Sequence, residues 1–289
     1  MIGTQVYGLK TEFEQDFEGT LEKIARMGFT RIEPLVIPID EQLPILPMDM
    51  WSFALLGRAQ QAAESLGLSM KTVHVGAGLG SPDQPDRIIA DSLLKIREIA
   101  GTDGFVFSGM FSDLEGARRC GEHLAVIAEY VKDAGCTVIY HNHNDEWALI
   151  ETGQETMPAM DLFYRFAGPD VMLELDIGWT ALVRDELQTA AAYADRIVEL
   201  HCRDFSDEAF SGKYTRQTMP ARCFVPVGTG RVKVREIMEA AKAFPHFGGD
   251  YIVEQEQSDG SMLESMERSL RTMQGWLSQE PGYGKGGSI

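Results

Sequence analysis

The sequence predicts a single-domain α/β protein with a (β/α)8 barrel, the TIM-barrel architecture. Eight β-rich runs alternate strictly with eight longer amphipathic runs, and strict alternation requires parallel strands joined by helical crossovers. The eight units occupy roughly 250 residues, which is the usual size of such a barrel. No GxGxxG motif follows the first strand, so the main signal of an open dinucleotide-binding sheet is missing.

The strands are expected where β-branched and aromatic residues cluster between turn signals. In chain order these segments are 3–9, 31–37, 71–76, 104–109, 137–143, 171–177, 197–202 and 250–256. The helices are expected where apolar residues recur at helical spacing, as Phe17, Leu21 and Ile24 do, before a glycine such as Gly28. These segments are 13–27, 53–66, 86–100, 113–134, 156–166, 186–193, 234–243 and 261–277.

One domain accounts for the whole chain. Residues 1–280 are expected to form the barrel, and residues 281–289, PGYGKGGSI, a flexible tail by their composition. The Pro- and Met-rich stretch 40–50 and the polar stretch 204–224 are expected to be loops. No linker divides the sequence, and no internal repeat appears beyond the βα unit itself.

The composition narrows the function classes. The formal net charge is −18, whereas a domain that binds nucleic acid needs a basic face for the phosphates, so nucleic acid is not an expected partner. No apolar run approaches the roughly 20 residues that cross a bilayer. The N-terminus lacks a signal-peptide pattern, so a cytoplasmic location is expected. Four cysteines without a CxxC pair predict reduced thiols.

Polar side chains collect at the ends of the predicted strands, where barrels of this kind carry their working residues. The stretch 137–147, TVIYHNHNDEW, ends a buried strand in two imidazoles and two carboxylates. Such groups are costly to bury unless something at the strand end needs them. Four of the six histidines stand at strand ends, and they are His74, His141, His143 and His201.

Closing the barrel places the last four predicted strands side by side, and one metal ligand from each is expected at a common point. These ligands are Glu146, Asp176, His201 and Glu254. Three carboxylates and one imidazole suit a divalent ion, Mn²⁺ first, with Mg²⁺, Co²⁺ and Zn²⁺ as alternatives. Without an ion the carboxylates would repel one another. Glu174 and Glu199 lie two residues earlier on their strands and fit either an inner polar layer or ligand roles.

Five runs of the sequence, YHNHNDEW, LELDIGW, ELHCRDF, VGTGRV and YIVEQEQS, resemble the xylose isomerase-like TIM-barrel family. The opening run FEGTLEKIARMGFTRIEP resembles the first helix and second strand of that family, so the resemblance spans nearly the whole chain. The family contains sugar isomerases and epimerases, endonuclease IV and inosose dehydratase. The YHNH run is similar to a subgroup with inosose dehydratase-like proteins and the TIM-barrel subunit of C-glycoside deglycosidases.

The resemblance implies a divalent metal held by Glu, Asp, His and Glu from the second half of the barrel. It carries three of these ligands onto Asp176 in LELD, His201 in ELH and Glu254 in IVE. The first ligand stays open between two residues, because many relatives have Glu where this chain has His141. Glu146, just beyond the strand, is the favoured ligand and His141 is the alternative.

The chemistry implied is proton removal next to the carbonyl of a sugar or keto-sugar, through a metal-stabilised enediolate or enolate. His143 is the expected base, because an imidazole titrates near neutral pH, and Glu146 or Glu254 is the second acid–base group. Four residues are expected to contact the substrate: His74, His141, Trp179 and Arg203. Trp179 stands where many epimerases have a histidine, so an epimerase mechanism does not transfer directly.

Two outcomes follow from one enolate. Return of the proton gives isomerisation or epimerisation, and loss of a β-substituent gives a lyase or dehydratase acting on 3-oxo-sugars or 3-oxo-glycosides. The deglycosidases carry a small β-rich subunit, so the expected partners are a sugar, keto-sugar or glycoside and either identical copies or such a subunit. A metal-dependent endonuclease is disfavoured by the charge of −18. A non-catalytic sugar-binding or scaffolding barrel is the remaining alternative.

Overall fold

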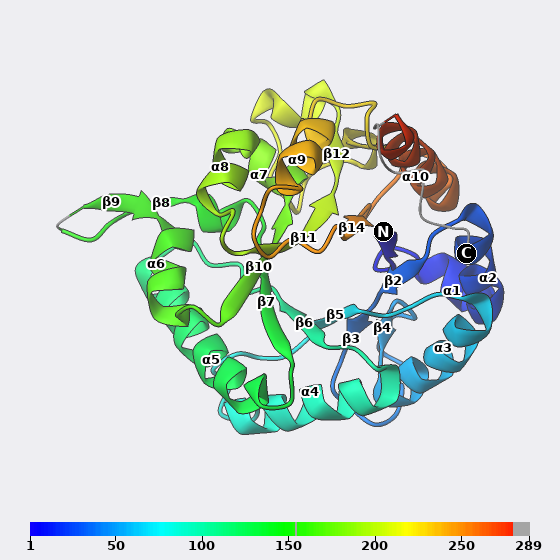
Figure 1. The fold of residues 1–289 in the computed structure, drawn as a ribbon, viewed down its shortest axis with the longest axis horizontal. Coiled ribbons are helices and arrows are strands. Elements are labelled where there is room, and N and C mark those ends of the chain that lie inside the picture. The colour runs from blue at the N-terminus through cyan, green and yellow to red at the C-terminus, as the bar shows by residue number, and fades with distance from the viewer. Residues whose placement is uncertain (154, 280–289) are drawn as a thin grey trace, which may run out of the picture.

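The computed structural model describes residues 1–153 and 155–279, and its wall strands form one parallel sheet that curves around an axis (Figure 1). The strand order is β2-β1-β14-β11-β10-β7-β6-β5-β3-β4. Only Pro34 separates β2 (Arg31–Glu33) from β3 (Leu35–Val36), so these two strands are halves of one extended segment. Because β2 pairs with β1 and β3 pairs with β5, the sheet closes on itself, and the predicted barrel is confirmed.

Eight strand positions make up the barrel wall in the described part of the chain, and β2 and β3 share one of them. The others are β1 (Ile2–Gln5), β5 (Thr72–Val75), β6 (Gly104–Phe107), β7 (Thr137–His141), β10 (Val171–Asp176), β11 (Ile197–Cys202) and β14 (Tyr251–Val253). Short additional strands are β4 (Met50–Trp51), β8 (Leu149–Glu151), β9 (Thr156–Pro158), β12 (Asp204–Phe205) and β13 (Phe224–Val225).

Helices surround the barrel on the outside (Figure 1). They are α1 (Lys10–Gln15), α2 (Phe17–Met27), α3 (Phe53–Leu66), α4 (Asp86–Ala100), α5 (Leu114–Lys132), α6 (Ala159–Ala167), α7 (Ile177–Ala181), α8 (Glu186–Ala192), α9 (Val234–Ala241) and α10 (Met262–Ser278). Polar caps set several helix starts. For example, the side chains of Ser52 and Asp113 accept hydrogen bonds from the backbone N–H groups of Leu55 and Gly116.

Several predicted segments differ from the structure or extend beyond it. The single helix expected over 13–27 is two helices, α1 and α2, which Asp16 separates. Residues 156–158, expected to begin a helix, form β9, which pairs with β8 in a hairpin that projects from the barrel (Figure 1). Pro158 disfavours helical backbone at the residue before it, so α6 begins only at Ala159. The stretch 204–224, expected to be irregular, contains β12 paired with β13 and the 3-10 turns η2 (Asp207–Ser211) and η3 (Ala221–Cys223). The predicted tail, 281–289, lies outside the described residues.

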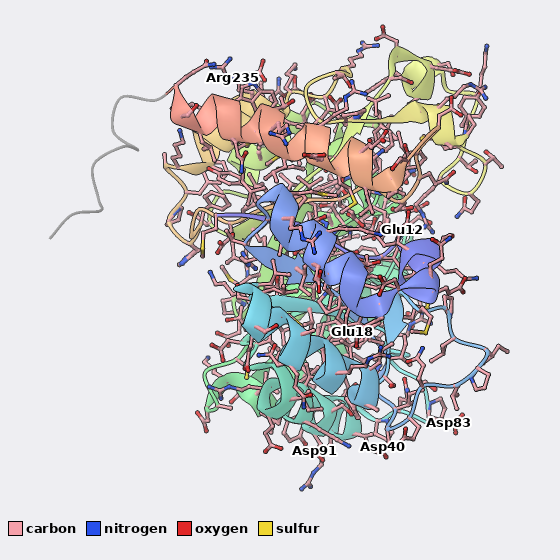
Figure 2. All side chains as sticks on the ribbon, turned by 90° about the vertical axis from the view of Figure 1, so that its right-hand side faces the viewer. Glu12, Glu18, Asp40, Asp83, Asp91 and Arg235 are labelled. Carbon is pink, nitrogen blue, oxygen red and sulfur yellow. The ribbon has the colours of Figure 1, made fainter. Side chains whose placement is uncertain are left out.

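Acidic side chains lie on the outer surface of the protein. Figure 2 labels several of them on the outer helices and the neighbouring loops, namely Glu12, Glu18, Asp40, Asp83 and Asp91. Within the described residues, no helix combines the length and the apolar character that a membrane span requires. The barrel interior differs from an ordinary apolar core, because buried charged side chains line its axis. These interior charges define the candidate site.

Candidate active site

Alternate residues of each wall strand point into the barrel, and the ends of neighbouring parallel strands bring them together. Asp176 ends β10 and lies in register with His201 of β11. Glu254 directly follows β14, two residues after Ile252, which lies in register with His201. All three polar side chains are buried. The structure therefore places three of the four predicted metal ligands side by side.

Carboxylates hold the His201 ring on both sides. Its Nδ1 lies 2.6 Å from Glu254 Oε2, and its Nε2 lies 2.7 Å from Glu33 Oε2 and 2.9 Å from Glu174 Oε1. Burial by itself would lower the pKa of His201, but Glu174, Glu33 and Glu254 raise this pKa well above its ordinary value. A carboxylate on Nε2 fixes the ring so that Nδ1 faces Glu254.

His141, the last residue of β7, approaches the same place. Its Nδ1 lies 2.9 Å from Glu174 Oε1, and its Nε2 lies 4.0 Å from Glu254 Oε2. One potential ligand atom from each of four buried residues lies within 4.8 Å of the others, and these residues are His141, Asp176, His201 and Glu254. A second group, equally close and one residue layer deeper in the barrel, contains His74, His141, Glu174 and His201.

Glu146, the predicted first ligand, lies apart from both groups. It belongs to η1 (Asp145–Trp147), the turn after β7, and its Oε1 accepts a hydrogen bond of 2.7 Å from the Tyr140 hydroxyl. Its Oε2 accepts a hydrogen bond of 2.9 Å from the backbone N–H of His143. Tyr140 alternates with His141 along β7 and so points outward, which keeps Glu146 on the outer side of the barrel wall. This placement favours His141, the alternative ligand.

Burial raises the pKa of the Glu146 carboxyl to about 7, although its hydrogen bonds with Tyr140 and with backbone N–H groups act in the opposite direction. The Tyr140 hydroxyl in turn accepts a hydrogen bond of 3.1 Å from the backbone N–H of Gly109. Glu146 and Tyr140 thus connect the segments that follow β6 and β7. Among the described residues, Glu146 does not belong to the groups of candidate ligand atoms.

Arg203 lies against the carboxylates of the candidate ligand set. Its Nε is 2.9 Å from Asp176 Oδ2, and its Nη2 is 2.6 Å from Glu254 Oε2 and 3.0 Å from Glu256 Oε1. The guanidinium also lies 5.1 Å from the ring centroid of Trp179. Both Arg203 and Trp179 are buried, and Trp179 packs behind Arg203 against Phe205. The predicted contact of Trp179 with substrate finds no exposed ring surface in this arrangement.

The surroundings of the two other predicted histidines, His74 and His143, shift their pKa values in opposite directions. His74 Nε2 lies 3.1 Å from Glu174 Oε1 and 3.3 Å from Glu33 Oε2. Burial opposes the protonated form of His74, but these two carboxylates raise its pKa to about 10. His143 is only 9% exposed, and burial lowers its pKa well below the ordinary value. This shift favours the neutral form of His143, and its Nδ1 is buried without a hydrogen-bond partner in the described part of the chain.

Glu33 and Glu174 also contact the candidate ligands. The sequence leaves Glu174 open between an inner polar layer and a ligand role, and it assigns no role to Glu33. Glu174 lies two residues before Asp176 on β10, so both side chains share the inward face. Glu33 ends β2, in register with Gln5 of β1. The two-residue period of a strand is the signal that places Glu174 on the inward face from the sequence. The contact between Glu33 and His201 depends on barrel closure, which no local pattern encodes.

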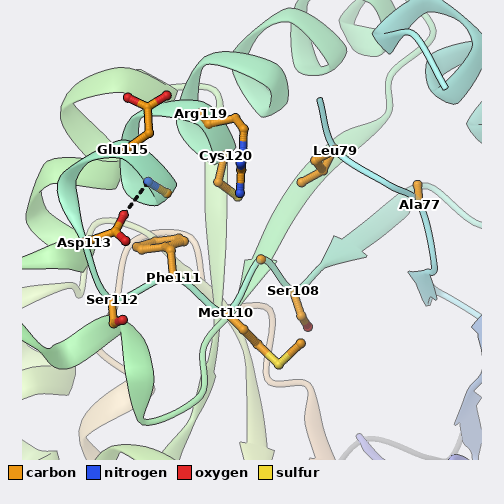
Figure 3. Close-up of a pocket in the computed structure, with 12 residues that line it drawn as sticks. Ala77, Leu79, Ser108, Met110, Phe111, Ser112, Asp113, Glu115, Arg119 and Cys120 are labelled. Atoms are coloured by element: carbon orange, nitrogen blue, oxygen red, sulfur yellow. Dashed lines mark hydrogen bonds between the residues drawn. The ribbon is translucent and has the colours of Figure 1, made fainter. Parts of the chain in front are cut away.

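A cavity of about 330 Å³ lies beside the barrel mouth, between the segments that follow β5 and β6 and the start of α5 (Figure 3). Ser108 lines it two residues after Val106, whose partner on β5 is His74, so Ser108 continues the inward face of β6. Leu79 and Phe111 add apolar surface. The cavity therefore adjoins the barrel interior and has the size of a small-molecule site.

The family model described as "Xylose isomerase-like TIM barrel" matches residues 21–278. The chain belongs to this family. Among curated proteins none matches the chain. The family assignment agrees with the closed parallel sheet and with the polar strand ends described above.

Several solved structures share their fold with the chain. A sugar phosphate isomerase/epimerase from Parabacteroides distasonis is 20% identical with a TM-score of 0.73, covering 94% of this chain and 93% of that one. The probable 3-DHS dehydratase AsbF from Bacillus anthracis is 11% identical with a TM-score of 0.64, covering 94% and 98%. A xylose isomerase-like TIM barrel protein from Mycobacterium smegmatis in complex with magnesium is 14% identical with a TM-score of 0.66, covering 96% of each chain.

Proposed function

We propose that this chain is a divalent-metal-dependent enzyme that removes a proton next to the carbonyl of a sugar or keto-sugar. The ion would be held by His141, Asp176, His201 and Glu254. The observation that carries the proposal is the convergence of two imidazoles and two carboxylates, all buried, at neighbouring strand ends. Such a mixed set suits Mn²⁺ first, with Co²⁺, Zn²⁺ and Mg²⁺ as alternatives. The related Mycobacterium smegmatis protein, solved with magnesium, is consistent with a divalent ion on this fold.

The contacts of both imidazoles support this ligand set. In each ring one nitrogen lies within hydrogen-bond distance of a buried carboxylate. These contacts are His141 Nδ1 with Glu174 and His201 Nε2 with Glu33. The other nitrogen of each ring faces Glu254. Metal-binding histidines usually hydrogen-bond a carboxylate through the nitrogen that does not bind the metal. The deeper group would use the very nitrogens that Glu174 and Glu33 already hold. The upper set is therefore the proposed site.

When bound, the ion would supply Lewis-acid stabilisation of negative charge on the substrate oxygens. His143 is the proposed base, because its ring lies 5.1 Å from the His141 ring and its buried Nδ1 has no partner among the described residues. Glu146 is proposed to position His143 through the backbone N–H. Glu254 is the proposed second acid–base group, since Glu146 faces away from the barrel axis.

Elimination from a 3-oxo-sugar or 3-oxo-glycoside is the second candidate reaction. The cavity that adjoins Ser108 favours it, because about 330 Å³ with apolar Leu79 and Phe111 would hold a leaving group beside the barrel interior. The structural relative described as a probable dehydratase is consistent with elimination on this fold. Both reactions begin with the same proton removal, so the same test applies to both.

The test measures α-proton exchange. The Mn²⁺-loaded protein is incubated in D₂O with keto-sugars and 3-oxo-glycosides, and deuterium incorporation next to the carbonyl is followed by NMR. Exchange is expected with at least one of these compounds, and it should stop after chelation and in His143→Asn. His123→Asn is the matched control, because His123 pairs with Asp86 on the outer helices and should leave exchange unchanged. Exchange that persists without metal, or no exchange with any compound, would refute the proposal.

A further inference from the structure

The loop between β12 and β13, residues 206–223, reaches along the barrel mouth. It begins after β11, yet Nη2 of its residue Arg216 donates a hydrogen bond of 2.8 Å to Sδ of Met110. Met110 follows β6, which lies three positions from β11 in the sheet order, with β10 and β7 between them. The loop therefore spans the part of the rim where the candidate site lies.

Two arginines face this mouth, and their partners differ. Arg203 contacts three carboxylates, those of Asp176, Glu254 and Glu256. Among residues 1–153 and 155–279, Arg216 has no carboxylate within ion-pair distance, and its buried Nε has no hydrogen-bond partner. Its hydrogen bond to Met110 uses a thioether, which is a weak acceptor. A buried guanidinium N–H without a good acceptor costs free energy unless a ligand supplies one.

Arg216 reaches two different segments of the mouth. It donates a hydrogen bond to Met110, which follows β6. Burial raises the pKa of Tyr7, which follows β1, and the charge of Arg216 opposes this rise. Arg216 therefore lies within electrostatic reach of the β1 side of the mouth as well as of the β6 side.

Met110 is held in an unusual backbone conformation. Its φ is +47°, the only positive φ of a non-glycine residue in the described chain, and such strain concentrates at functional sites. Its side chain is 48% exposed and lies at the edge of the cavity beside the mouth (Figure 3). A half-exposed methionine can move away from Arg216 without opening the core.

We propose that Arg216 is a specificity-determining residue that binds an anionic substituent of the sugar substrate, a carboxylate or a phosphate. Nε and Nη2 form one edge of the guanidinium, and two oxygens of an oxyanion match that edge better than one sulfur does. One oxygen of the oxyanion replaces Met110 Sδ as the acceptor for Nη2. The other oxygen accepts a hydrogen bond from Nε, which otherwise has no partner among the described residues. In a chain of net charge −18, Arg216 supplies a positive charge at the mouth, and no carboxylate of the described residues lies within ion-pair distance of it. The inference rests on the proposed function, since it adds a second recognition point for the same substrate.

The test compares matched ligands on the Mn²⁺-loaded protein by isothermal titration calorimetry. Glucuronate and glucose 6-phosphate are each compared with glucose, which separates a carboxylate from a phosphate. The wild-type protein is expected to bind at least one anionic ligand about ten-fold or more tightly than glucose. Arg216→Met should abolish that preference while changing the Kd for glucose less than about two-fold. Arg216→Lys should restore part of it, because lysine keeps the charge without the planar fork.

Arg235→Met is the matched control, since Arg235 lies on the outer helix α9 and donates to Gln279 at the end of α10, and it should keep the full preference. Met110→Ala should bind the anionic ligand at least as tightly as the wild type. An Arg216→Met variant that retains the preference, or a wild-type protein without one, would overturn the inference. Metal content is measured on every variant. An Arg216-dependent anion preference in a protein that catalyses no α-proton exchange would support this inference while refuting the proposed function.

Discussion

Asp176 and His201 belong to the barrel wall, whereas Glu146 lies just beyond it, and the two regions orient their side chains by different rules. On β10 and β11 the backbone ladder sets the register, so Asp176 lies beside His201 and both point inward. After His141 the strand ends and the chain enters η1, where the two-residue alternation no longer applies. The strand residues Asp176 and His201 are placed by the sheet, whereas Glu146, five residues after the end of β7, is placed by its own turn.

The difference has a chemical consequence in this molecule. The turn gives the Glu146 carboxylate two hydrogen-bond donors, the Tyr140 hydroxyl and the His143 N–H, on the outer side of β7. His141, still on the strand, takes the inward position beside Glu254. The candidate ligand set therefore has two imidazoles and two carboxylates in place of one imidazole and three carboxylates.

Replacing a ligand on the wall is expected to have the largest effect. Asp176→Asn should bind almost no Mn²⁺ and lose α-proton exchange by about 10³-fold or more, because the ion supplies several kcal/mol of charge stabilisation. It also weakens the pairing of buried Arg203, which costs about 3–5 kcal/mol of unfolding free energy. Metal analysis of the folded protein and chemical denaturation measure the two effects. Asp185→Asn, at the exposed cap of α8, is the control and should bind metal normally.

Replacing His141 or Glu146 by glutamine, one at a time, compares directly the two residues that compete for the role of first metal ligand. His141→Gln should weaken Mn²⁺ binding more than about 100-fold, beyond the usual loss for an outer-shell residue. Glu146→Gln should leave the metal affinity within about two-fold, because its carboxylate contacts Tyr140 and His143 instead. Competition with a fluorescent chelator measures both affinities. The reverse order of effects would place Glu146 among the ligands.

A smaller effect is expected one contact away from the ion. Glu33→Gln keeps the size of the side chain but removes the charge beside His201 Nε2, 2.7 Å away. Metal affinity should fall by about 10- to 100-fold, the usual range for the hydrogen-bond partner of a metal-binding histidine. The same chelator competition measures it. An unchanged affinity would mean that Glu33 does not orient His201 for metal binding.

The last comparison concerns the stability of the protein and its dependence on pH. Burial raises the pKa of Glu146 to about 7 in the folded protein, above the ordinary glutamate value. The folded state then binds more protons than the unfolded state. The protonation of Glu146 therefore adds to the free energy of unfolding below about pH 4.5, and this stabilisation is lost as the pH rises through about 7. Wild-type protein should therefore lose on the order of 3 kcal/mol between pH 4.5 and 8 relative to Glu146→Gln. Urea unfolding of both proteins at the two pH values checks this difference. Parallel pH profiles would contradict it.

The fold could be predicted because its signals are local. Apolar spacing within each segment distinguishes helices such as α4 from strands such as β10, and their alternation leaves few topologies. The failure at residues 156–158 has a local cause as well, since Pro158 and the hairpin with β8 outweigh the helical spacing of the apolar residues. The contents of the 204–224 loop depend on the pairing of β12 with β13, a contact distant in sequence.

The sequence could predict the part of the candidate site whose geometry follows from the arrangement of the strands. Asp176, His201 and Glu254 are neighbours because parallel strand ends meet. The roles of Glu33 and Arg216 come from contacts that join distant parts of the chain, Glu33 to His201 and Arg216 to Met110. The spacing of residues within a helix or a strand does not predict such contacts, so only the three-dimensional structure identifies them.

Anomalous X-ray scattering from crystals of the Mn²⁺-loaded protein tests the central claim most directly. One manganese peak is expected, coordinated by His141 Nε2, His201 Nδ1 and carboxylate oxygens of Asp176 and Glu254. Glu146 should keep its hydrogen bonds to Tyr140 and His143. A peak coordinated by Glu146, a peak in the deeper group of His74 and Glu174, or no peak within the barrel would contradict the proposed ligand set.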